Sequence, residues 1–325
     1  MKKKSGFILS LIVSGIAIIW LIQKVNIQEF QHTIKQINYL WWLFSALIYL
    51  FAFFPRGLRW QLMLSTIKKV PLADSTQVVV LGYAANNLLP FRLGEIVRAY
   101  IMGNKNSISK ITCLGSIVAE RVIDGIVIVC LLGMSMILLT STIQQTEALK
   151  QIFFTSGIIF LSAVFLLILI LIYSKTILKI GKRFFGQSEQ AFLEKIVNSL
   201  NFLRTKRILF QTLLLSIFVW LIEGAMFALV LWVMGFKNPV AMGYFCLGIV
   251  NLGILLPSAP GYIGVYQAAS VFAFLALGYS ESAGLAYGLL IHTAQYIPIT
   301  LIGITIFHRF GYRFSNFYKN ISGTT

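Results

Sequence analysis

Long apolar runs separated by short polar segments make up most of this chain. Runs of membrane-spanning length lie at about residues 1–22, 39–55, 111–140, 152–173, 208–234 and 284–307. Because a helix of roughly 20 apolar residues crosses the hydrocarbon core of a bilayer, the pattern predicts six spanning helices. The first run follows lysines, as in a secretory signal, but it exceeds the roughly 7–15 apolar residues of such a signal and lacks its cleavage site. We expect it to be retained as a span.

Two further apolar regions are interrupted by proline and glycine. Residues 76–90 contain the start of LLPFRLG, and residues 240–278 contain LLPSAPGYIG. Irregular backbone at membrane depth is tolerated only where protein or a wet cavity surrounds it, because lipid cannot satisfy its N–H and C=O groups. Each interruption therefore predicts a broken helical hairpin whose turn lines an internal cavity.

The basic residues decide how these regions run. Suppose that both hairpins are re-entrant and that the N-terminus is cytoplasmic. All Lys and Arg residues then lie on the cytoplasmic side, with five exceptions: Arg121 lies within a span, and Lys24, Lys35, Lys150 and Lys237 lie outside. Such an excess is typical of cytoplasmic loops. If residues 76–90 crossed fully, the basic residues that follow them would lie outside, against that rule. We expect a multi-pass protein of the cell (inner) membrane with both termini cytoplasmic.

This topology makes the two halves, about 1–145 and 146–325, inverted copies within one membrane domain, 1–325. The pattern LLPxxxG occurs twice, as LLPFRLG ending at Gly94 and as LLPSAPG ending at Gly261. Broken helices at matching positions of inverted halves mark the substrate site of many transporters. A chance match of common membrane residues is the alternative. The predicted fold class is an all-α polytopic membrane protein with about six full spans plus two re-entrant helical hairpins.

Composition supports this class and limits the chemistry. The chain has 325 residues, of which 58% are hydrophobic, and a net charge of +17 that falls mainly between apolar runs. The charge is thus first a topology feature and predicts no nucleic-acid partner. Its three cysteines and three histidines match no disulfide or metal spacing, so we assign no metal, cofactor or catalytic residue and expect the cysteines to be core residues.

The stretch NNLLPFRLGEIVRAY combines a helix break with charge. Pro90 ends a helix, Gly94 permits a turn, and Asn86 and Asn87 can hydrogen-bond the freed backbone. A helix restarting after the break places three charged residues together near its start: Arg92, Glu95 and Arg98. The functional hypothesis is an arginine fork for an anionic head group. The alternative is interfacial arginines that snorkel, and Arg98 fits either equally well.

A second charged patch lies in ERVID. Glu120 and Asp124 share a helix face, and Arg121 neighbours Asp124 at i, i+3. If the span begins at residue 111, the patch lies near mid-bilayer, where charges are usually functional. If it begins at residue 123, Glu120 and Arg121 are headgroup-level anchors.

The remaining candidates have supporting roles. RGLRW, with Arg59, closes the second run and fits interfacial anchoring. Glu223 stands alone inside a span and needs a partner, for which Arg92 or Arg121 qualifies. The second interruption carries no charge and fits packing or gating, through Pro257, Pro260, Gly261 and Gly264.

Four segments in order, RGLRW, NNLLPFRLGEIVRAY, ERVID and LLPSAPGYIGVYQ, resemble the flippase-like transmembrane region of the lysylphosphatidylglycerol synthases, a region that also exists as stand-alone membrane proteins. The resemblance implies re-entrant helices and the handling of polar lipids, including movement of lysyl-lipid between leaflets. In the synthases a soluble lysyl-transfer domain follows this region. This chain stops at Thr325, so we do not expect lysyl transfer here.

Three functions remain open at this stage. The leading hypothesis is a translocase for a polar or anionic, phosphate-bearing lipid or lipid carrier. The second is a membrane-embedded transferase acting on a lipid-linked substrate, with Glu120 or Asp124 as base, although no nucleophile-plus-base pattern is visible. The third is an accessory subunit that anchors a synthase through the basic segment 174–207. The expected partner is a membrane lipid, with a synthase or a second copy of the chain as further partners.

Overall fold

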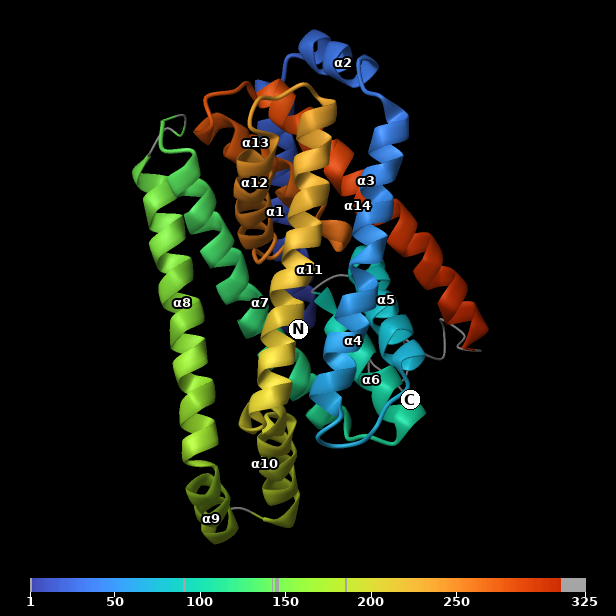
Figure 1. The fold of residues 1–325 in the computed structure, drawn as a ribbon, viewed down its shortest axis with the longest axis vertical. Helices are drawn as coiled ribbons and strands as arrows, with labels where there is room; N and C mark the ends of the chain where they lie inside the picture. Colours follow the sequence, from blue (N-terminus) through green and yellow to red (C-terminus); the bar gives the residue numbers. More distant parts are fainter. Residues whose placement is uncertain (1, 90–91, 142, 144–145, 185, 311–325) are drawn as a thin grey trace.

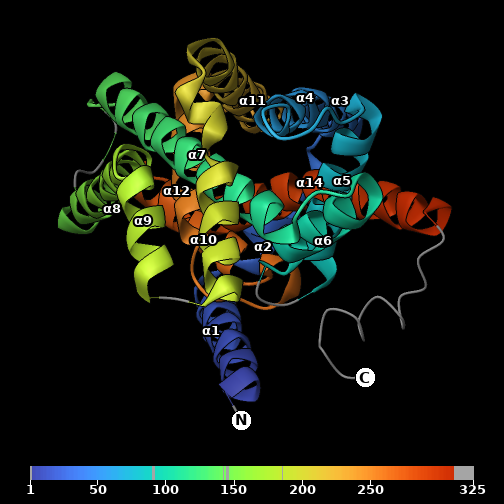
Figure 2. The ribbon, with the colours of Figure 1, turned by 90° about the horizontal axis from the view of Figure 1, so that it is seen from below.

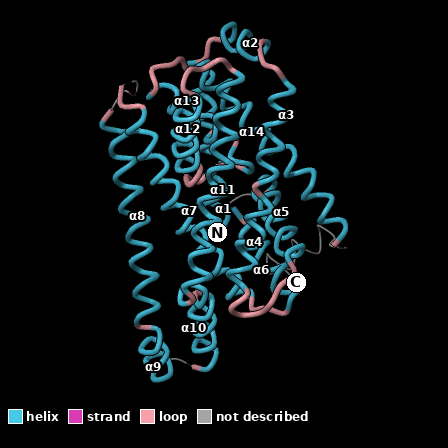
Figure 3. Tube along the Cα trace, viewed as in Figure 1, coloured by secondary structure: helices cyan, strands magenta, loops and turns pink. Residues whose placement is uncertain are grey.

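The computed structural model describes residues 2–89, 92–141, 143, 146–184 and 186–310, and every regular element in these ranges is a helix (Figures 1 and 3). Five helices are long and apolar enough to cross a membrane. They are α3–α4 (Tyr39–Phe51 and Phe53–Leu64), α7 (Lys110–Leu138), α8 (Glu147–Ile172), α11 (Lys206–Val233) and α14 (Glu281–Arg309). The all-α membrane class predicted from sequence is confirmed.

Helices α1 (Lys2–Lys24) and α2 (Ile27–Lys35) add a sixth span if Ser10–Lys24 and Ile27–Lys35 are counted as one. These two parts meet at an angle of 92° across a short break. Asn26 causes the new start by accepting hydrogen bonds from the N–H groups of Gln28 and Glu29 at 3.0 and 3.2 Å. Such a side-chain cap satisfies the otherwise unpaired donors of a first helical turn.

The second span continues to Leu64, beyond its predicted end near residue 55. Pro55 falls in the first turn of α4, where its missing N–H and fixed φ are tolerated. The proline therefore does not end the span, and RGLRW is helical inside it.

Two short-helix hairpins lie among the long helices. Helices α5 (Leu72–Leu88) and α6 (Gly94–Asn106) form the first, and α12 (Pro239–Gly253) and α13 (Val265–Ala276) form the second. In Figure 1 the first hairpin enters from the lower end and the second from the upper end, and their turns approach each other near mid-height. The helices α9 (Ser174–Phe184) and α10 (Gln187–Ser199) lie at the lower end, as Figure 2 shows from below.

Helix α8 lies at the edge of the bundle and buries only one of its apolar side chains, Leu149, as expected for a helix facing lipid (Figure 2). The predicted core placement of the cysteines is right for Cys113 and Cys246 but wrong for Cys130, which is exposed. Periodicity cannot distinguish a lipid-facing from a protein-facing apolar position, because both environments favour apolar side chains.

Candidate functional site

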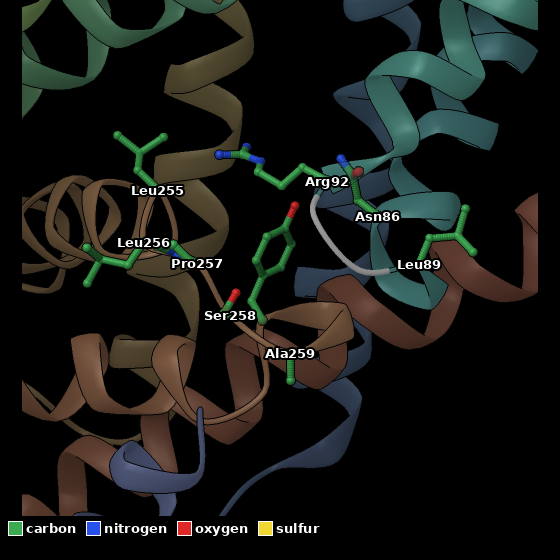
Figure 4. A pocket seen from close by; sticks show the side chains of 9 residues that line it. Asn86, Leu89, Arg92, Leu255, Leu256, Pro257, Ser258 and Ala259 are labelled. Carbon is green, nitrogen blue, oxygen red and sulfur yellow. The ribbon is translucent and has the colours of Figure 1, made fainter. Parts of the chain in front are cut away.

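A cavity of about 210 Å³ lies between the two helix interruptions. One side of the cavity is formed by the end of α5 and the residues just before α6. The other side is formed by the loop after α12. Its lining residues are Asn86, Leu89, Arg92, Leu255, Leu256, Pro257, Ser258, Ala259 and Tyr262. Figure 4 shows Arg92 extending from the first side across the cavity toward Leu255 on the second. The interrupted segments, separated by more than half of the chain, meet at one cavity as predicted.

Asn86 shapes the first wall of this cavity. Its Oδ1 accepts a hydrogen bond of 2.7 Å from the N–H of Gly94, which begins α6. The predicted role of Asn86 in satisfying freed backbone is confirmed. Pro90, to which the helix break was assigned, lies outside the described residues.

The predicted turn-forming role of Gly94 is wrong. The left-handed residue of this turn is Arg92, with φ of 52°. Gly94 instead permits close helix packing, because a Cβ there would lie 1.9 Å from the carbonyl oxygen of Gly82 on α5.

The second wall depends on glycines with positive φ. Gly261 has φ of 67° and Gly264 has φ of 88°, values that side chains rarely adopt. Gly264 also donates its N–H to Gln267 Oε1 at 2.9 Å, which starts α13 after the short helix η3 (Pro260–Tyr262). A Cβ on Gly261 would lie 2.5 Å from the Tyr296 ring, so this tip rests on α14.

Asn87 connects the first hairpin to α14. Its amide nitrogen donates to Thr300 Oγ1 at 2.8 Å, and its carbonyl accepts from the Tyr296 hydroxyl at 3.3 Å. Both hairpin tips are therefore seated on the same part of α14.

A buried ion network lies beside the cavity and is centred on Glu120 of α7. Arg98 of α6 makes two hydrogen bonds to its carboxylate, of 3.1 and 3.0 Å, and Arg59 of α4 lies 3.1 Å from it. Arg121 also contacts Glu120. Because Glu120 is only 2% exposed, its charge is compensated by these three arginines rather than by water.

Asp124 is the second carboxylate of this network. Arg59 donates to it at 2.5 and 3.1 Å, and the Trp220 indole N–H donates at 2.9 Å. Arg121 lies 3.1 Å from Asp124 at the predicted i, i+3 spacing. The compact charged patch predicted from ERVID thus forms, and its depth inside the protein argues against headgroup anchoring.

The predicted partners of Glu223 are wrong. Its carboxylate pairs with Arg56 of α4 and accepts a hydrogen bond of 3.2 Å from Gln295 of α14. The Arg56 guanidinium also lies among four aromatic rings at 5.1–5.9 Å, those of Tyr49, Phe53, Tyr83 and Trp220. This pair joins α4 to α11.

The interpretation of RGLRW as an interfacial anchor is also wrong. Arg56, Arg59 and Trp60 are all at most 2% exposed. Trp60 supports the network because its ring lies 4.4 Å from the Arg98 guanidinium carbon and its N–H donates to Ser116 at 3.1 Å. Arg56 is a site residue that the sequence pattern did not single out, although it lies one helical turn before Arg59, a spacing typical of one helix face.

Arg92 lines the cavity, and Glu95 accepts a hydrogen bond of 3.4 Å from Asn86, another lining residue. The Arg92 guanidinium is 5.7 Å from the Tyr262 ring, and Tyr262 is in electrostatic range of Arg92, Glu95 and Arg121. The buried atoms Arg92 Nε, Glu95 Oε2 and Arg121 Nε have no hydrogen-bond partner among the described residues. Arg98, which the sequence placed beside Arg92 and Glu95, uses its fork on Glu120 instead.

Among the described residues, no group of three or more metal-ligating side chains has the geometry to hold an ion. The polar chemistry at the cavity is instead that of guanidinium, amide, phenol and carboxylate groups. Guanidinium groups recognise phosphate and carboxylate through paired hydrogen bonds.

Residues 7–303 match the protein family described as the lysylphosphatidylglycerol synthase TM region. No solved structure matches the chain significantly.

Three relatives are similar to the chain at low identity. The glycosyltransferase AglD of Haloferax volcanii is 22% identical over 80% of this chain, which spans only 47% of that protein. The UPF0104 membrane protein MJ1078 of Methanocaldococcus jannaschii is 24% identical, with 69% of this chain and 92% of the relative aligned. A UPF0104 membrane protein of Methanothermobacter thermautotrophicus is 19% identical over 96% of this chain and 97% of its own.

Proposed function

The chain belongs to the family of the lysylphosphatidylglycerol synthase TM region, and we propose that it translocates a polar membrane lipid whose head group carries phosphate. One observation carries the proposal: the two interrupted helices meet at a cavity into which Arg92 extends. Transporters use broken helices at such meeting points to contact polar substrates, because the freed backbone and side chains replace water.

In this proposal the head group enters the cavity while the acyl chains stay in the bilayer. Leu255 and Leu256 line the cavity and are 52% and 58% exposed, so the site has an apolar rim. Such a rim suits the junction of a polar head with its hydrocarbon tails. The second hairpin, with its glycine-dependent turn, is the element that moves to admit the lipid.

The proposed orientation has both hairpins re-entrant, one from each side of the membrane, in inverted halves of about 1–145 and 146–325. Both termini are then cytoplasmic in the cell membrane. The opposite entry of the two hairpins in Figure 1 supports this orientation, as does the excess of basic residues at the end that carries α9 and α10.

Cysteine labelling tests this orientation. In a background without the native cysteines, we expect Asn104→Cys on α6 to react with a membrane-impermeant maleimide only after the cells are opened. Lys237→Cys, before α12, should react in intact cells. Both positions are exposed in the structure, so accessibility reports the side of the membrane. Labelling of Asn104→Cys in intact cells would refute the cytoplasmic entry of the first hairpin.

The translocase proposal itself is tested at Arg92 in proteoliposomes that contain a fluorescent phospholipid quenched from outside. Arg92→Lys retains the charge but loses the planar fork, so translocation should fall about tenfold or more. The translocation rate of Arg92→Gln should fall by at least the same factor.

The matched control is Lys105→Gln, on the helix α6 that follows Arg92. Lys105 pairs with Asp74 at 2.9 Å, away from the cavity, and its loss should leave the rate unchanged. If the wild-type protein does not accelerate exchange between leaflets, translocation is the wrong function. If Arg92→Lys matches the wild type while both Gln variants fail alike, Arg92 acts only as a topological charge.

A transferase is the second candidate, favoured by the similarity to a protein named as a glycosyltransferase. The chain spans about half of that relative, and Glu120 and Asp124, the candidate bases, are each held by two or more arginines. Transfer of a labelled sugar to lipid by the purified chain would support this candidate over translocation.

A further inference from the structure

A buried histidine of α14 lies beneath the turn of the second hairpin. His292 is 7% exposed, and its ring stacks on the Tyr266 ring of α13 with centroids 4.4 Å apart and an angle of 11° between the planes. The Tyr296 ring meets the imidazole edge-on at 5.6 Å. The backbone of Gly261, in the hairpin turn, also interacts with the imidazole. The ring is therefore held in one position against the hairpin.

Gln267 connects the imidazole to the start of α13. Its Oε1 accepts a hydrogen bond from the Gly264 N–H at 2.9 Å, and its Nε2 lies 2.9 Å from His292 Nδ1. Because Gly264 uses the amide oxygen, the group that faces Nδ1 is the NH₂, which is a donor. Nδ1 is then an acceptor, so the hydrogen-bond pattern assigns His292 the neutral form with its proton on Nε2.

Protonation of His292 is incompatible with this arrangement. The imidazolium carries a proton on each nitrogen, so an Nδ1–H would face the NH₂ of Gln267, and two donors cannot bond each other. Rotation of the amide removes the conflict, because it turns Oε1 toward Nδ1 and away from Gly264. Gly264 has φ of 88° and directly precedes α13. A proton on His292 is therefore gained at the expense of a hydrogen bond that holds the hairpin turn.

The other titratable groups near the imidazole are already engaged. The two tyrosines that face it donate their hydroxyls to Gln295 and to the Asn87 carbonyl. Glu223 of α11 accepts from Gln295 and is paired with Arg56 of α4. Among the described residues of the helices that pack against α14, no charged side chain interacts with the imidazole. His292 is thus the group at this turn that suits a change of charge between pH 5 and 8.

We propose that His292 is a proton-binding site coupled to the second hairpin: proton uptake releases Gly264 and the start of α13, and proton loss restores them. His292 does not line the cavity, so the proton has a site separate from that of the lipid. The consequence for transport rests on the proposed function. If the second hairpin is the wall that moves, the proton is a second ligand that controls its movement.

Hydrogen exchange of the full chain in nanodiscs at pH 5 and pH 8 tests the coupling, after correction for the intrinsic effect of pH on exchange. The Gly264 amide should exchange about fivefold faster or more at pH 5, because one hydrogen bond is worth about that factor. The first hairpin is the internal control. Asn86 holds the Gly94 N–H there at 2.7 Å and faces Glu95, whose carboxyl accepts in either protonation state. Exchange of Gly94 should be equal at both pH values.

Two variants separate the proton from the packing of the ring. His292→Asn offers an amide oxygen to Gln267 but takes up no proton in this range. Gln267→Glu keeps the stacked ring, and its two carboxylate oxygens accept from Gly264 and from a protonated Nδ1 together. In both variants the Gly264 amide should exchange slowly at pH 8 and equally slowly at pH 5. Slow exchange at pH 5 is a gain of protection that a misfolded hairpin cannot produce.

Equal corrected exchange of the Gly264 amide at pH 5 and pH 8 in the wild type would overturn the proposal. A pH response that persists in Gln267→Glu would overturn it as well. Translocation measured at both pH values distinguishes this proposal from the proposed function. A hairpin that responds to pH in a protein that moves no lipid supports the proton site and refutes translocation. Lipid movement without a response of the hairpin supports translocation and refutes the proton site.

Discussion

Glu120→Gln is expected to destabilise the folded protein more than any other single change in the ion network. Glu120 compensates Arg59, Arg98 and Arg121 together. The neutral amide would leave Arg98 without an ion-pair partner among the described residues, and Arg59 and Arg121 with Asp124 alone. Breaking a buried ion pair from one side costs about 3–5 kcal/mol. The measurement is thermal unfolding in detergent, combined with the amount of protein recovered from the membrane.

The matched control for this change is Glu147→Gln at the start of α8. Glu147 also forms an ion pair, with Lys150, but its side chain is 79% exposed, so water replaces the lost contact. Its unfolding temperature should equal that of the wild type. Equal unfolding temperatures for Glu120→Gln and Glu147→Gln would show that the network does not stabilise the fold.

The second large effect is expected at the pair between Arg56 and Glu223. Arg56→Met leaves the Glu223 carboxylate buried, with Gln295 as its one remaining donor in the described part of the chain. Glu223→Met leaves Arg56 charged among aromatic rings. Each single change should cost about 3–5 kcal/mol. The double change, Arg56→Met with Glu223→Met, should recover most of that loss, because a flexible thioether packs well against the surrounding aromatic rings.

Unfolding of the two single variants and the double variant, measured as a double-mutant cycle, gives the coupling energy directly. Strictly additive losses would mean that the two side chains act independently and that the pair does not join α4 to α11. If coupling is found, translocation by the stable double variant then tests whether the pair serves stability alone.

The two ionic clusters hold the scaffold around the cavity. Glu120 and Asp124 of α7 connect α4 and α6, while Glu223 connects α11 to α4. In contrast, the cavity wall after α12 depends on turn glycines and apolar contacts. Among the described residues, this wall forms no ion pair. A rigid ionic frame beside a non-ionic tip fits a substrate site in which one wall moves.

The sequence alone determined the membrane class and the two helix interruptions, because both depend on local physics. A run of about 20 apolar residues spans a bilayer whatever surrounds it, and a segment that combines proline with glycine disfavours a continuous helix by its own covalent structure. The i, i+3 pairing of Arg121 with Asp124 was predictable for the same reason, since helix geometry sets it.

Only the tertiary structure decided the partners of the buried charges. Arg56 and Glu223 are 167 residues apart, and Arg59 and Asp124 are 65 apart, so no local pattern relates them. An arginine near the end of a span can be a water-facing anchor or a member of a buried ion pair. Which of the two it becomes depends on the helices that pack against α4. Because charges attract without regard to sequence distance, their pairing follows from the packing of α4, α6, α7 and α11 and cannot be read from any one of them.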